Sequence, residues 1–118
     1  MRLLFSTLAL TLSLSLAANS AFSEELKICA AYQKTDGTYS HNYKLRATIT
    51  PGAQVAKIID DGYLAFVEPT KNYLHISWKK GGHTFIDLKG SEIPTTGLLS
   101  EDEKGKTWIV KSSWYQCN

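Results

Sequence analysis

The stretch NYLHISWKKGGHTFIDLK, residues 72–89, decides the predicted fold class. Apolar and polar residues alternate on both sides of two glycines, which is typical of two half-buried strands joined by a tight turn. A three-residue loop at 80–82 would pair Ile76 with Ile86 and gather the aliphatic side chains on one face. The stretch therefore predicts a β-hairpin with one face turned toward a core.

The opposite face of this hairpin is where we expect a binding site. In the predicted register His75 lies across from Asp87, and polar and aromatic side chains share the face. This face would be either covered by the segment Gly90–Gly105 or presented to a partner. The candidate binding residues are Tyr73, His75, Lys79, His83, Phe85 and Asp87.

The N-terminal part of the chain predicts a second hairpin. Asp36-Gly37 is a strong signal for a two-residue hairpin loop, because both central positions of a type I′ turn require positive φ. With that loop Ile28 pairs with Leu45, and the apolar residues of both strands fall on one face. Turn and pattern agree, which supports the register.

Further turn signals divide the middle of the chain. Thr50–Ala53 contains Pro-Gly, which favours a type II turn, and it predicts a strand starting at Gln54. A strand over 63–68 would then pair with the 72–89 hairpin. Gly90–Gly105 has loop composition, and we expect one helical turn at 98–103. Residues 106–117 predict a final strand or a bulged strand pair.

These elements predict an all-β domain. Short strands separated by regular turns indicate an antiparallel meander of about seven strands. The meander would close into a small up-and-down barrel or a curled sheet, and a two-sheet sandwich is the alternative. Cys29 and Cys117 lie near the ends of the domain, and a disulfide between them would tie the first strand to the last.

Residues 1–23 have the order of a secretory signal peptide. One arginine precedes an uncharged apolar run, and small residues follow it. The run is shorter than the roughly 20 residues that span a bilayer, so we expect no membrane insertion after cleavage. The sequence therefore predicts a single domain over 24–118 that is secreted or periplasmic.

Composition and motifs narrow the function classes. The formal net charge is +2 and no Lys/Arg cluster stands out, so a nucleic-acid partner is not expected. The chain has no G-x-S-x-G, H-E-x-x-H, Walker or C-x-x-C motif. A hydrolytic site using His75, Asp87 and Ser77 is a minor alternative, and the predicted register holds His75 and His83 too far apart for a metal site with Asp87. We expect no cofactor.

One segment resembles a known family. Ile76–Gly90 is similar to the strand–Trp–Lys–Gly–strand–Gly stretch of small exported bacterial inhibitors of C-type lysozyme, and it covers about a fifth of the chain. Those inhibitors are antiparallel barrels with a disulfide from the first strand to the chain end, so the resemblance implies architecture. Their Ser-Gly-x-x-Tyr inhibitory motif is not kept: Pro69–Tyr73 holds its place, and only Tyr73 matches.

The sequence predicts a non-enzymatic binding module. Rigid amphipathic rings favour protein or sugar contacts when exposed. We expect another protein as the partner, in an inhibitor or immunity type of interaction, with a small-ligand or glycan-binding barrel as the alternative. We expect Trp78 and one of Trp108 or Trp114 to fill the interior, most of the other rings to lie in the core, and a minority to be exposed for such contacts. The tyrosines and tryptophans in question are Tyr32, Tyr39, Tyr43, Tyr63, Tyr73, Trp78, Trp108, Trp114 and Tyr115.

Overall fold

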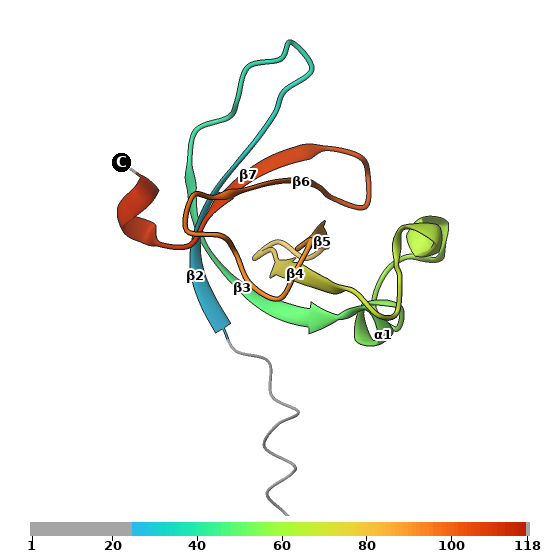
Figure 1. Cartoon of the computed structure of the whole chain (residues 1–118). Coiled ribbons are helices and arrows are strands. Elements are labelled where there is room, and N and C mark those ends of the chain that lie inside the picture. Colours follow the sequence, from blue (N-terminus) through green and yellow to red (C-terminus); the bar gives the residue numbers. More distant parts are fainter. Residues whose placement is uncertain (1–24, 118) are drawn as a thin grey trace, which may run out of the picture.

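The computed structural model describes residues 25–117, so the predicted signal peptide lies outside the described residues. Six antiparallel strands curl into a nearly closed barrel (Figure 1), as predicted, in the order β5-β4-β3-β2-β7-β6. The strands are β2 (Glu25–Tyr32), β3 (Tyr43–Pro51), β4 (Asn72–Ser77), β5 (His83–Asp87), β6 (Leu98–Glu101) and β7 (Thr107–Lys111). Three short helices accompany them: α1 (Gly52–Val55), η2 (Asp61–Phe66) and η3 (Trp114–Cys117).

The barrel is continuous where the first and last strands meet. Ala30 of β2 pairs with Val110 of β7 in an antiparallel ladder. The opening lies instead between β5 and β6, where Ile86 of β5 forms an isolated bridge with Asp102, the residue that follows β6. Side chains add to this seam, because Ser100 Oγ donates to the Asp87 carbonyl at 2.7 Å.

The register of the first hairpin is confirmed, with Ile28 opposite Leu45. Its loop differs from the prediction: Gly37 N donates to the Lys34 carbonyl at 2.9 Å, and Lys34 N donates to the Thr38 carbonyl at 2.7 Å. The loop therefore has three residues, and Gly37 takes φ +90, which glycine adopts without strain. One extra residue on the returning strand restores the predicted pairing.

The predicted strands at 54–59 and 63–68 are wrong. β3 pairs directly with β4, with Ile49 opposite Leu74, and the intervening segment is helical. Val55 and Ile59 are both buried and four residues apart, which is helical spacing that alternation obscured. Gly52 starts this excursion against the backbone of Glu68, where an added Cβ would meet the carbonyl oxygen.

The central hairpin forms, but its predicted register is wrong. Trp78 N donates to the Gly82 carbonyl at 3.1 Å, so the three-residue loop is 79–81 rather than 80–82. Ile76 consequently faces Thr84, and Leu74 faces Ile86. The shift moves every partner by two residues, so each side chain keeps its predicted face.

The barrel interior is filled by side chains. The largest member is Trp108, which is 3 % exposed and contacts the partly buried Trp78. The other buried members are aliphatic residues of all six strands and their connections: Ile28, Ala30, Ala47, Leu74, Ile76, Ile86, Leu88, Ile93, Leu98 and Val110.

The C-terminal third differs from the prediction at two elements. The predicted final strand over 106–117 ends with β7 at Lys111, and residues 114–117 form the helix η3. Residues 98–101 form β6 instead of a helical turn, with Leu98 and Ser100 buried and Leu99 exposed.

Cys29 and Cys117 form the predicted disulfide, with Cα atoms 5.3 Å apart. A disulfide is compatible with a protein that folds outside the reducing cytoplasm. Among residues 25–117, no helix is long and apolar enough to cross a membrane.

Candidate functional site

Two of the predicted binding residues belong to a second core. Tyr73 and Phe85 are each 1 % exposed and lie under the helical excursion 52–67. The Tyr73 hydroxyl accepts from Glu68 N at 2.7 Å and donates to the Phe66 carbonyl at 3.3 Å. This face of the hairpin is therefore covered at Tyr73 and Phe85, mainly by the excursion. Glu103 of the Gly90–Gly105 segment adds one contact, because its Oε1 accepts from Phe85 N at 2.9 Å.

The predicted pairing of His75 with Asp87 is wrong. His75 lies opposite Phe85, and Asp87 accepts a hydrogen bond from Lys71 Nζ at 3.1 Å. The two-residue change of register separates the histidine from the carboxylate. His75 and His83 come together instead, with His75 Nε2 2.8 Å from His83 Nδ1. Lys79 is exposed in the β4–β5 loop.

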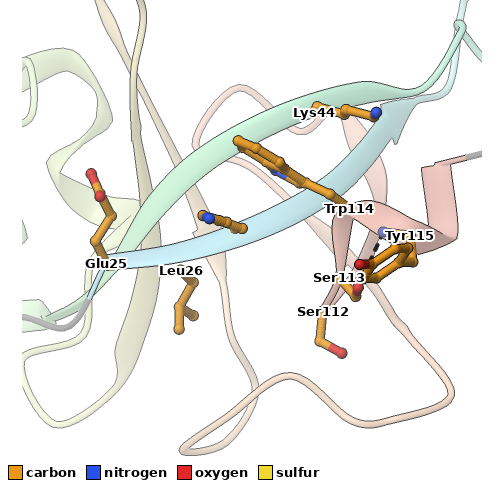
Figure 2. Close-up of a pocket in the computed structure, with 8 residues that line it drawn as sticks. Glu25, Leu26, Lys44, Ser112, Ser113, Trp114 and Tyr115 are labelled. Atoms are coloured by element: carbon orange, nitrogen blue, oxygen red, sulfur yellow. Dashed lines mark hydrogen bonds between the residues drawn. The ribbon is translucent and has the colours of Figure 1, made fainter.

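A different aromatic surface lies on the outside of β2 and β3, where η3 folds back over the sheet (Figure 2). It forms an open hollow of about 700 Å³. The residues that line it are Glu25, Leu26, Lys27, Lys44, Ser112, Ser113, Trp114 and Tyr115. We call this set the η3 surface.

Trp114 is fixed on the η3 surface by polar and cationic contacts. Its Nε1 donates to the Leu45 carbonyl of β3 at 3.0 Å. Lys27 Nζ and Arg46 Cζ lie 5.1 and 5.2 Å from its ring centroid, within the range of cation–π attraction. The ring is therefore tied to β3 by a hydrogen bond and lies close to two basic side chains.

Tyr115 projects from the same turn into solvent. Its side chain is 90 % exposed, the largest exposed fraction among the exposed large hydrophobic residues of the described part. The backbone beneath it is fixed, because Tyr115 N donates to Ser113 Oγ at 3.1 Å (Figure 2) and Cys117 is tied to β2. Asn42 Nδ2 also donates to the Cys117 carbonyl at 3.3 Å. An exposed ring thus stands on an anchored backbone.

The charge around this surface is mainly positive. Lys27, Lys44 and Arg46 surround it against one acidic residue, Glu25, which pairs with Arg46 at 3.2 Å. Both members of that ion pair are more than half exposed, so the pair adds little stability. The basic side chains are therefore available to a partner.

The sequence contained a signal for this surface that our prediction did not use. Trp114 and Tyr115 are adjacent, so in an extended strand they would point to opposite faces, and one of them would leave the core. Both residues belong to the aromatic set singled out from the sequence, whereas the predicted site lies on the hairpin. Their exposure depends on η3, which the sequence did not predict.

A second aromatic hollow, of about 260 Å³, lies at one end of the barrel. Tyr32 packs on Trp108 at 5.5 Å, and Tyr43 packs on Trp78 at 6.3 Å, between ring centroids. Asp102 is buried at its base and accepts from Trp108 Nε1 at 2.8 Å. Its other carboxylate oxygen accepts from Lys104 N at 2.9 Å and from Lys106 N at 3.0 Å, so Asp102 fixes the surrounding loop. The aromatic rings are therefore the part of this hollow that suits a sugar.

Comparison with protein-family models, with curated proteins and with solved structures gave no match. The resemblance to lysozyme inhibitors therefore stays a prediction. Within the part of the chain that the structure describes, no group of three or more His, Cys, Asp or Glu side chains could hold a metal ion. The η3 surface, the aromatic hollow at the barrel end and the histidine pair are therefore the candidate sites of this protein.

Proposed function

We propose that this protein is an exported, non-enzymatic module that binds another protein through the η3 surface. The observation that carries the proposal is Tyr115, a large ring that is 90 % exposed on a turn anchored by the disulfide. Tyr and Trp are the residue types most enriched among the energetic centres of protein interfaces. Secretion or retention in the periplasm is part of the proposal.

The rigidity of the η3 surface supports a binding role. An ordered side chain loses less conformational entropy when it enters an interface, so more of its contact energy appears as affinity. Here Trp114 is fixed by a hydrogen bond and two cations, and Tyr115 stands on an anchored backbone. The two rings can therefore act as a preformed platform.

The charges define the partner chemistry. Three basic side chains surround the rings, so an acidic segment on the partner would gain charge-assisted hydrogen bonds at the rim while an apolar side chain contacts Tyr115. We therefore propose a protein partner that presents an acidic loop with an apolar tip. Inhibition or neutralisation of that partner is the interaction type we favour.

Competitive capture tests this proposal. Tagged protein, exported and purified, is incubated with extract of the native cell envelope and the retained proteins are identified. Excess untagged wild type should displace the specific partner, whereas Tyr115→Ala should displace it at least tenfold less effectively. Ile58→Ala removes an exposed apolar residue on the excursion and should compete like wild type. If Tyr115→Ala displaces the partner as effectively as wild type, the η3 surface is not part of the interface.

The barrel-end hollow supports a second candidate, the binding of a glycan or another small polar ligand. Four rings line it together with Asp102 and Lys106, whose Nζ lies 4.4 Å from the Tyr32 ring centroid. Screening the protein against oligosaccharides by thermal shift separates the candidates. A sugar-specific shift that is lost in Trp78→Ala and kept in Tyr115→Ala would favour this hollow.

A further inference from the structure

The two histidines of the central hairpin form a pair that the proposed protein interface does not use. His75 on β4 and His83 on β5 point their ring nitrogens at each other, with Nε2 and Nδ1 2.8 Å apart. Imidazole nitrogens bind Zn²⁺ and Cu²⁺ well. We infer that His75 and His83 form a two-imidazole binding site for a divalent transition-metal ion of this class.

The separation of the two nitrogens fits a shared ion. With metal–nitrogen distances of about 2.0–2.1 Å, two ligand nitrogens of one ion lie about 2.9–3.4 Å apart, depending on the bond angle. The observed 2.8 Å needs to open by only a few tenths of an ångström. His83 is exposed, so its ring can turn to direct both lone pairs at one point.

The packing holds the ring of His75 in place. It stacks on Phe85, with ring centroids 4.7 Å apart and planes 21° from parallel, and Phe85 is itself buried. One ligand is therefore preorganised and the other is adjustable.

The surroundings of His83 supply negative charge. His83 borders a hollow of about 170 Å³ that Asp60, Glu103 and Lys104 also line. Two carboxylates against one ammonium group favour a cation there. Glu103 already accepts from Phe85 N at 2.9 Å, so we assign both protein ligands to the histidines and the remaining positions to water.

Titration with Cu²⁺ tests the inference, because imidazole sites bind Cu²⁺ most tightly among the divalent first-row ions. The exported full-length product, purified through a tag without histidine, is titrated calorimetrically. We expect one Cu²⁺ per chain, with affinity reduced at least tenfold in His75→Gln and in His83→Gln. His41→Gln removes the remaining histidine and should bind like wild type.

Nuclear magnetic resonance of the wild type keeps the test independent of variant folding. Substoichiometric Cu²⁺ is paramagnetic and should broaden the imidazole signals of His75 and His83 before those of His41. Equal broadening of all three histidines, or equal Cu²⁺ affinity in all four proteins, would overturn the site. Loss of binding in His41→Gln alone would do the same.

Discussion

At the residue scale, the sequence predicts the correct face of the hairpin for His75 but the wrong cross-strand partner. The alternation of 72–89 places His75 on the face away from the aliphatic core, and that placement is confirmed. Its partner depends on the position of the loop within Lys79–Gly82. Two glycines and two lysines make neighbouring three-residue loops nearly equivalent in sequence, so the pattern alone could not choose between them.

The lowered pKa of His75 predicts a pH-dependent stability. Above about pH 6.5 the histidine is neutral in both folded and unfolded chains. As the pH falls below that value, the unfolded chain binds the proton first, because burial and His83 lower the pKa in the folded state, and the free energy of unfolding decreases. Denaturant titration at pH 7.5 and pH 5.0, with a chelator present, measures the decrease.

The variant His75→Gln should lose less stability than wild type between these two pH values, since glutamine does not titrate. An identical decrease in both proteins would show that His75 contributes nothing to the acid sensitivity. Circular dichroism at pH 7.5 checks that the variant keeps the native fold.

At the element scale, Tyr73 connects the excursion 52–67 to the barrel. The sequence predicts a binding role for this residue, whereas the structure gives it a packing role. Its buried hydroxyl pairs with the Glu68 amide and the Phe66 carbonyl. Tyr73→Phe keeps the packing of the ring and leaves both backbone groups without this partner. We expect a loss of about 1–3 kcal/mol in the free energy of unfolding.

Denaturant titration measures this loss. Tyr39→Phe, at a ring that is 37 % exposed, is the matched control, with no expected change beyond about 0.5 kcal/mol. The partner captured by the η3 surface should bind Tyr73→Phe as tightly as wild type. If Tyr73→Phe keeps the stability of wild type but binds the partner more weakly, Tyr73 is a binding residue and not a structural one.

At the scale of the whole molecule, the sequence predicts the overall architecture correctly, but several of the individual strands and helices incorrectly. Turn spacing and alternation predict a disulfide-closed antiparallel barrel, and Cys29–Cys117 confirms the link between the first strand and the chain end. The helical segments were missed because each is one or two turns long. Val55 and Ile59 lie four residues apart, a spacing that puts two side chains on one face of a strand as well as on one face of a helix. Only tertiary packing decides between the two structures.

The disulfide should dominate the stability of this barrel. It closes a loop with a sequence separation of 88 residues, which in the chain-entropy model contributes about 4–5 kcal/mol. We expect the double variant Cys29→Ser/Cys117→Ser to lose stability of this order under oxidising conditions. Denaturant titration measures the loss, and a reductant should change wild type but not the variant.

The η3 surface as a protein-binding platform is the central claim, and site-specific photo-crosslinking tests it most directly. A photoreactive residue replaces Tyr115 in one protein and Ile58 in another. Position 58 is the control, because η3 and the excursion 52–67 lie on opposite sides of the barrel (Figure 1). After illumination in native envelope extract, we predict one dominant adduct from position 115 that excess wild type suppresses. No suppressible adduct from position 115, or the same adduct from both positions, would contradict the claim.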